Sequence, residues 1–161
     1  MKKLFKNIYL VIKYPFLKMN KTFLVTWQDY VPYGWQYIAM QLWGEIDKEL
    51  KRFNGSKYKF HDIIYGSKLK IYDIKEKYGR LDIDYSFDGP SNIWDIINDL
   101  FLKYEYISER TCIDCGRRAK YVTGGWILPK CEYCLDEYGK AHAQEYYKDM
   151  KWYDYSKTFN K

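Results

Sequence analysis

Four cysteines in the C-terminal third have the residue type and spacing best suited to chemistry. They form two CxxC pairs separated by fifteen residues: Cys112, Cys115, Cys131 and Cys134. A CxxC pair makes a tight turn that points two sulfurs at one centre, and Gly116 after the first pair permits a positive φ there. Two such turns supply four thiolates in a tetrahedron, the geometry of a structural zinc site. The spacing therefore predicts one structural Zn²⁺ per chain.

Other uses of paired cysteines fit this chain less well. Two disulfides need an oxidising compartment, and we expect no export signal, because no cleavage site of small residues follows the short apolar run near the N-terminus. A thioredoxin-like site needs one CxxC at a strand-to-helix junction rather than two matched pairs. A catalytic zinc needs an open coordination position, which four thiolates do not leave. An iron–sulfur cluster uses the same ligands and stays the alternative, although the paired spacing favours zinc.

The segment between the two cysteine pairs has the pattern of a short hairpin. Residues 117–127 are predicted to form two short strands around a Gly-Gly turn, as in a zinc ribbon or zinc knuckle. We expect Trp126 to pack beside the metal and shield it, because a four-thiolate module has little other core. The alternative is that Trp126 is a base-stacking platform, with Arg117 and Arg118 beside it.

Three aspartates offer the remaining candidate chemistry. Asp82 and Asp84 lie on one face of a predicted strand, about 7 Å apart, and Asp73 comes from the preceding strand. Such carboxylates can hold Mg²⁺ for phosphodiester chemistry, but we favour an ordinary solvent face of an antiparallel sheet. His61 and His142 complete no nucleophile–base set, and no glycine-rich phosphate loop occurs. We therefore favour a protein that is not an enzyme.

The elements that position these residues follow from hydrophobic periodicity. Apolar side chains recur every three or four residues in 34–52 and again in 91–109, which predicts two long amphipathic helices. Apolar and polar residues alternate in 81–87, and 69–73 precedes it, which predicts a hairpin connected by 75–79. The fold class is therefore α+β, an antiparallel sheet packed against two main amphipathic helices, with a C-terminal zinc-ribbon or zinc-knuckle module.

The chain divides into three predicted regions. These are an α+β domain at 1–110, a four-cysteine zinc module at 111–137, and a C-terminal helix and tail at 138–161, with the helix reaching about Met150. With 161 residues, of which 47% are hydrophobic, the chain can bury a core of its own. No apolar run approaches the length of a membrane span, so we expect no membrane partner.

The charge of the chain is unevenly distributed. The net charge is +6, residues 1–30 carry six lysines and one acid, and residues 61–100 carry five bases and eight acids. Apolar residues lie among the N-terminal lysines, so we expect this arm to dock on the domain and present its lysines outward. We favour a solvated face for these lysines, and a phosphate-binding surface is the alternative.

Five stretches carry a resemblance to a known family. They are residues 12–17 (IKYPFL), 31–35 (VPYGW), 74–79 (IKEKYG), 108–116 (SERTCIDCG) and 125–127 (GWI), the last running into Cys131 and Cys134. With these stretches the chain resembles a widespread family of small uncharacterised proteins of tailed bacteriophages and prophages, with a C-terminal four-cysteine zinc site. The resemblance covers most of the chain up to about residue 137.

The resemblance implies a phage accessory protein that acts in the cytoplasm of the bacterial host. It carries no catalytic residue onto this chain. Family members often have Leu-Arg after the glycine of the 74–79 stretch, whereas this chain has Arg80-Leu81, followed by Asp82 and Asp84. The departure makes the strand more acidic and weighs against a basic role for that face.

Two classes of function follow from these observations. In the first, the protein binds and modulates a host protein, such as a defence, transcription or replication factor. Six tryptophans and 19 tyrosines exceed what a core of this size needs, and both residue types are favoured at protein interfaces. In the second, it is a zinc-containing nucleic-acid-binding protein, which the acidic strand and the five arginines disfavour. The oligomeric state leaves no signal in the sequence.

Overall fold

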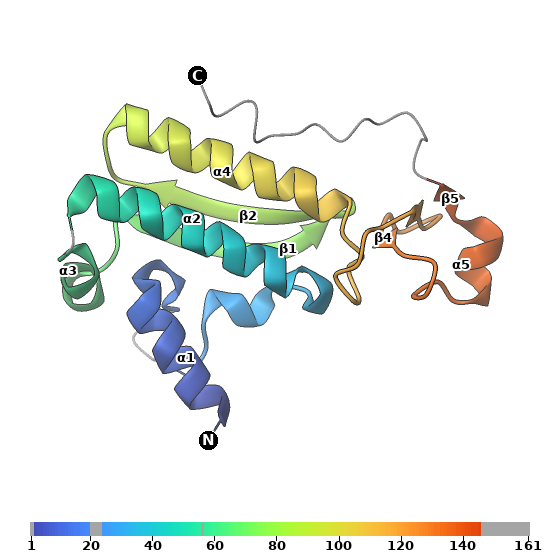
Figure 1. The fold of residues 1–161 in the computed structure, drawn as a ribbon, viewed down its shortest axis with the longest axis horizontal. Helices are drawn as coiled ribbons and strands as arrows, with labels where there is room; N and C mark the ends of the chain where they lie inside the picture. The colour runs from blue at the N-terminus through green and yellow to red at the C-terminus, as the bar shows by residue number, and fades with distance from the viewer. Residues whose placement is uncertain (1, 20–23, 56, 146–161) are drawn as a thin grey trace.

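Two long helices lie side by side across a two-stranded antiparallel sheet in the computed structural model, which describes residues 2–19, 24–55 and 57–145. The helices are α2 (Gln36–Asn54) and α4 (Ser91–Glu109), and the strands are β1 (Leu69–Lys77) and β2 (Arg80–Phe87). Figure 1 shows the helix pair covering one face of the sheet. The predicted α+β class, with an antiparallel sheet, two main helices and a cysteine cluster towards the C-terminus, is confirmed.

The two helices form because their apolar side chains repeat at helical intervals and meet in one core. The buried residues of α2 are Ile38, Ala39, Leu42, Trp43, Ile46 and Leu50, and α4 contributes Ile93, Ile97, Leu100, Phe101 and Tyr104. Helix α2 stops at Gly55, whose φ of 79° suits glycine. Above the core, Glu45 accepts hydrogen bonds from the Lys103 ammonium and the Tyr104 hydroxyl, both at 2.8 Å, which ties α2 to α4.

The hairpin is longer than the sequence predicts. Its register pairs Leu69 with Phe87 and Lys77 with Arg80, with an irregularity between Ile71 and Asp73. The strands therefore run through most of the segment expected as a loop, and only a two-residue turn joins them. Both turn residues, Tyr78 and Gly79, have positive φ, as a tight hairpin turn requires.

The N-terminal arm folds into a helix followed by three 3-10 turns. They are α1 (Lys2–Lys13), η1 (Pro15–Leu17), η2 (Trp27–Tyr30) and η3 (Tyr33–Trp35). The arm docks on the domain as expected, because Leu10 and Val11 are buried. The Asn7 amide donates hydrogen bonds to the Leu24 carbonyl at 2.7 Å and to the Asp29 carboxylate at 3.0 Å. A short helix, α3 (Tyr58–Tyr65), contacts α1.

The C-terminal part contains a small three-stranded sheet and one short helix. The strands β3 (Tyr121–Val122), β4 (Pro129–Lys130) and β5 (Gln144–Glu145) are ordered β4-β3-β5, and α5 (Glu137–His142) precedes β5. The second strand of the hairpin therefore lies just beyond the predicted 117–127. The expected long C-terminal helix ends at His142, and the rest of its predicted span beyond 145 is outside the described residues. None of the described helices is long and apolar enough to cross a membrane.

Candidate metal centre

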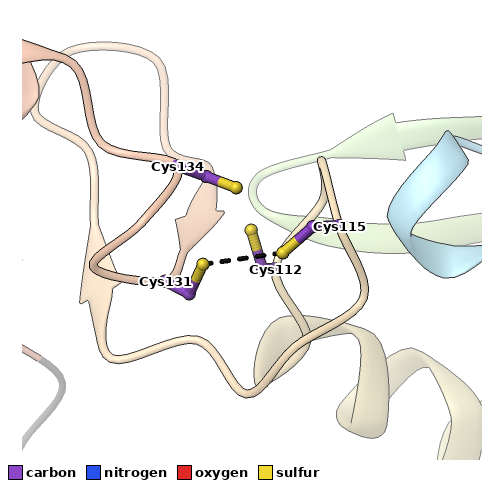
Figure 2. Close-up of side chains that lie close together, drawn as sticks. All are labelled: Cys112, Cys115, Cys131 and Cys134. Atoms are coloured by element: carbon purple, nitrogen blue, oxygen red, sulfur yellow. Dashed lines mark hydrogen bonds between the residues drawn. The ribbon is translucent and has the colours of Figure 1, made fainter.

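The four cysteines meet at one point beside the small sheet. Their sulfur atoms all lie within 4.8 Å of one another, so together they could hold a metal ion. Figure 2 shows the sulfurs of Cys115 and Cys131 facing each other, and they lie 3.5 Å apart. Cys112 and Cys131 are buried, whereas Cys115 is exposed. A tetrahedral zinc–thiolate site with bonds of about 2.3 Å places sulfurs about 3.8 Å apart, so the residues fit such an ion.

Backbone hydrogen bonds shape both turns that present the sulfurs. In the first turn, the Gly116 N–H donates to the Cys112 carbonyl at 2.9 Å and the Cys112 N–H donates to the Arg117 carbonyl at 2.7 Å. Gly116 has φ of 75°, as the sequence predicts for the residue that leaves this turn. In the second turn, the Cys134 N–H donates to the Cys131 carbonyl at 3.1 Å. Both cysteine pairs are therefore pre-shaped to direct two sulfurs inward.

The thiols of this cluster titrate unequally. Burial raises the pKa of Cys112 above the ordinary value. Burial acts to raise the pKa of Cys131, but hydrogen bonds from the Cys115 thiol and neighbouring groups together lower it to about 7. The pKa of Cys134 is raised, first by its contact with Cys115 and then by burial. The raised pKa values of Cys112 and Cys134 favour their neutral thiols, because thiolates at this distance repel each other unless a cation compensates them.

The first cysteine turn packs directly on the start of the helical layer. The Gly34 N–H donates to the Ile113 carbonyl at 2.8 Å, and the buried Trp35 indole donates to the Thr111 carbonyl at 2.8 Å. A Cβ at position 34 would overlap the Cys112 carbonyl oxygen and would lie 2.6 Å from the Ile113 carbonyl carbon. Glycine is therefore required at this position, where the entry to α2 contacts the metal centre.

The tip of the β1–β2 hairpin also contacts the module, at the loop that precedes the second cysteine pair. The Trp126 indole donates to the Glu76 carboxylate at 2.8 Å, and the other oxygen of Glu76 accepts from the Gly79 N–H at 2.7 Å. A Cβ on Gly79 would lie 3.1 Å from the Ile127 side chain, so the two loops are in close contact. Trp126 itself is 72% exposed. The expectation that Trp126 packs beside the metal is wrong, because its ring lies on the surface and its indole is held by Glu76.

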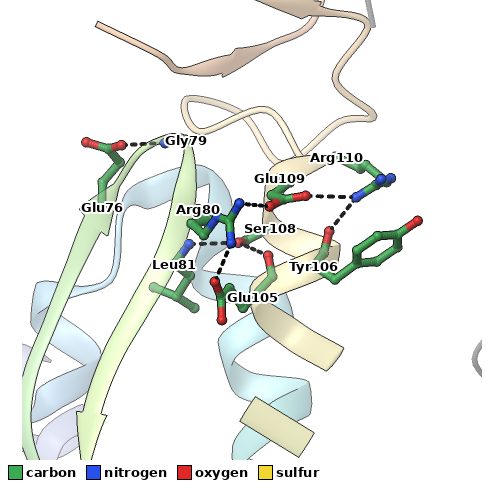
Figure 3. Close-up of polar contacts among 9 residues, drawn as sticks. All are labelled: Glu76, Gly79, Arg80, Leu81, Glu105, Tyr106, Ser108, Glu109 and Arg110. Carbon is green, nitrogen blue, oxygen red and sulfur yellow. Dashed lines mark hydrogen bonds and ion pairs between the residues drawn. The ribbon is translucent and has the colours of Figure 1, made fainter. Parts of the chain in front are cut away.

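The helix that leads into the first cysteine pair is fixed to the hairpin by polar contacts. Figure 3 shows Arg80 bridging Glu105 and Glu109 of α4, each at 2.8 Å, while the Leu81 N–H donates to the Ser108 hydroxyl at 2.7 Å. Arg110 in turn contacts the Glu109 carboxylate at 3.1 Å. Cys112 therefore lies three residues beyond a helix end that the sheet holds in place.

Four of the five stretches singled out in the sequence converge at this centre. Residues 31–35 contact the segment 108–116, and residues 74–79 contact 125–127, although about 50 to 80 positions separate the contacting residues in the chain. The CxxC spacing predicts the cysteine cluster but not these supporting loops. The close glycine contacts and the glutamate–indole hydrogen bond depend on tertiary placement, and no spacing rule predicts them.

The aspartates proposed as an alternative metal site do not form one. Asp73 lies opposite Asp84 across the hairpin and forms an ion pair with Lys75. The neighbouring carboxylates, Asp73 first, raise the pKa of Lys75 and so favour its charged form. In the part of the chain that the structure describes, the four cysteines are the only group of three or more potential ligands placed to hold a metal ion.

The outer surface of the module carries exposed aromatic side chains, Trp126, Tyr133 and Tyr138. The Arg117 guanidinium lies 4.9 Å from the centre of the Tyr133 ring. Three lysines of the module are engaged with carboxylates: Lys120 with Glu132, Lys130 with Asp114, and Lys140 with Glu137. The surface is thus rich in aromatic groups, and much of its positive charge is already paired.

Comparison with known proteins yields one match. No model of a protein family and no solved structure matches the chain. The chain is 32% identical over 91 residues to the genome polyprotein of Potato virus Y (strain C). The alignment includes 49% of this chain and spans 10% of the polyprotein's length. No activity of the polyprotein is carried over to this chain.

Proposed function

We propose that the cysteine cluster holds one structural zinc ion per chain. The observation that carries this proposal is the convergence of four sulfur donors within 4.8 Å, which leaves no position for a water or substrate. The same donors suit an iron–sulfur cluster, but two CxxC turns that close on a single centre are typical of zinc. The contacts of the first cysteine turn with Gly34 and Trp35 support a structural role, because the ion would fix the segment that begins α2.

We further propose that the protein is a non-enzymatic, phage-type accessory protein that binds and modulates a host protein in the bacterial cytoplasm. An aromatic surface on the module supports a binding role. It is defined here as the tryptophan face: Trp126, Tyr78 and Ile127, which are exposed at the hairpin contact, and Tyr138. Trp126 and Tyr138 also line a cavity of about 280 Å³. Tryptophan and tyrosine are the side chains that most often dominate interface energies.

The tryptophan face is also preorganised for binding. The hydrogen bond from the indole to Glu76 fixes the ring, and Glu76 is itself held by the Gly79 N–H. A side chain that is already ordered loses less conformational entropy when a partner covers it. We propose a defence, transcription or replication factor of the host as the partner class.

A nucleic acid is the second candidate partner, and the exposed Trp126 ring is the observation that favours it. Bases stack on exposed aromatic rings, and Arg117 beside Tyr133 could add a cationic contact. The carboxylate partners of Lys120, Lys130 and Lys140 weigh against this function, because a phosphate backbone would have to displace them. We therefore rank a host protein first.

The test is capture of partners from host lysate by the tagged protein, with and without nuclease. We expect one partner that resists nuclease and is lost with Trp126→Ala. Trp94→Ala removes an exposed tryptophan from α4, away from the module, and should retain the partner. Association that nuclease abolishes and that falls with added salt would instead select the nucleic-acid function. Equal capture by Trp126→Ala and the unchanged protein would contradict the role of the tryptophan face.

A further inference from the structure

Helix α1 has an apolar stripe that the fold leaves uncovered. Phe5, Tyr9 and Ile12 are 67%, 58% and 56% exposed. They are four and three positions apart, which places them on one face of a helix. The opposite face of α1 carries the buried Asn7, Leu10 and Val11 and docks on the domain. Helix α1 therefore has apolar side chains on two faces, and the domain covers only one of them.

Lysines accompany this stripe, and α1 has no acidic residue. Lys2 precedes Phe5 by three positions and Lys6 precedes Tyr9 by three, so both border the stripe. Both are exposed, and among the residues that the structure describes neither has a carboxylate within ion-pair distance. Only Lys3, towards the docked face, pairs with a carboxylate, that of Asp29 at 3.6 Å. The uncovered face therefore combines apolar area with positive charge.

The position of α1 narrows the class of surface that could cover this stripe. Figure 1 shows α1 outside the layers of helix and sheet, with the N-terminus at the far edge of the molecule. A second copy of the chain is disfavoured, because pairing two such faces would bring lysines against lysines. The exposed stripe of α1 forms a single convex ridge. A flat, negatively charged surface can bind it, because no matching groove is needed. Phenylalanine, tyrosine and isoleucine bordered by lysine are typical of helices that lie in a bilayer interface.

We propose that the outward face of α1 binds the surface of an anionic phospholipid bilayer, with Phe5, Tyr9 and Ile12 in the headgroup region and Lys2 and Lys6 on lipid phosphates. Such a helix lies on the membrane and does not cross it. The proposal therefore differs from a membrane span, which neither the sequence nor the described helices provide. It is independent of the proposed binding of a host protein through the tryptophan face.

The test is co-sedimentation of the full-length, metal-loaded protein with phosphatidylcholine vesicles that contain or lack phosphatidylglycerol. We expect binding only to the phosphatidylglycerol vesicles, and weaker binding as salt rises. The Phe5→Ser, Ile12→Ser double variant and the Lys2→Glu, Lys6→Glu double variant should each lower the bound-to-free ratio about tenfold or more. All four positions are exposed, so these variants should keep the circular dichroism spectrum of the unchanged protein.

Matched controls alter the same residue types elsewhere on the surface. Trp94→Ser with Leu102→Ser removes exposed apolar groups from α4, and Lys68→Glu with Lys70→Glu reverses charge beside β1. Both controls should bind vesicles as the unchanged protein does. No binding to phosphatidylglycerol vesicles, or equal losses in test and control variants, would overturn the proposal. So would purified protein that binds duplex DNA or an acidic protein through Lys2 and Lys6 while ignoring vesicles.

Discussion

Gly34 lies where the backbones of the main domain and the metal centre are in direct contact. It has no side chain in a place where a Cβ would overlap the Cys112 carbonyl, and its N–H bonds the Ile113 carbonyl. In the sequence, Gly34 is indistinguishable from a residue that simply precedes a helix. The structure shows a different reason for it, which is the close approach of two backbones.

The Gly34→Ala substitution should therefore destabilise the protein, because the added methyl group must push the first cysteine turn away. We expect a loss of about 1–3 kcal/mol in the free energy of unfolding, as for other overpacked sites. Equilibrium denaturation in the presence of zinc measures it, with metal affinity as a second readout.

Gly44→Ala is the matched control for this substitution. Gly44 lies inside α2, and the nearest atom to a Cβ there is the Tyr14 hydroxyl oxygen at 3.7 Å, so the methyl group fits. Alanine is also the better helix former, which should add about 0.5–1 kcal/mol of stability. If Gly34→Ala is as stable as Gly44→Ala and binds zinc equally well, the described packing of Gly34 against the first cysteine turn is incorrect.

Among the helices and strands, hydrophobic periodicity predicted the long and regular ones. The apolar stripes of α2 and α4 and the alternation of β2 locate the central elements, because burial of one face dominates their energetics. The apolar run of α1 is too short to predict its structure, and the predicted hairpin connection of 75–79 is longer than the observed two-residue turn. A short apolar run is compatible with both a helix and a strand. The strand residues next to the hairpin turn are mostly polar in this chain, so they resemble a loop in sequence.

Loss of the metal should affect elements according to their contact with the cysteine turns. Cys131→Ser removes one of four ligands, so we expect the metal to be lost and residues 111–145 to exchange amide hydrogens faster. Protection from hydrogen exchange should also fall around Gly34 and Trp35, because both donate hydrogen bonds to the segment of the first cysteine turn. The middle turns of α2 and α4 should stay protected, because their apolar residues pack on each other and on the sheet.

Hydrogen exchange followed by mass spectrometry measures this pattern. Chelation of the unchanged protein is the control and should reproduce it, because the ion rather than the serine is the cause. Unchanged exchange at residues 33–35 would show that the centre is an independent appendage. Uniform loss of protection throughout α2 and α4 would show that the whole fold depends on the ion.

At the scale of the whole molecule, the metal centre joins parts of the chain that are distant in sequence. The entry to α2, the tip of the hairpin and the end of α4 all contact the module that contains the cysteines. The convergence of the four cysteines was predictable because CxxC spacing is a local property. The exposure of Trp126 was not, since it depends on Glu76, fifty residues earlier in the chain. The exposure of the apolar stripe on α1 was likewise not predictable, because it depends on which face of the helix docks on the domain.

If the four cysteines hold one structural zinc ion, elemental analysis of the purified protein will detect it. Protein purified without chelator should contain one equivalent of zinc per chain and little iron, and Cys131→Ser should contain far less zinc. Its absorbance should show no visible band of an iron–sulfur cluster. Less than about half an equivalent of zinc in folded protein, or iron with sulfide in its place, would contradict the account.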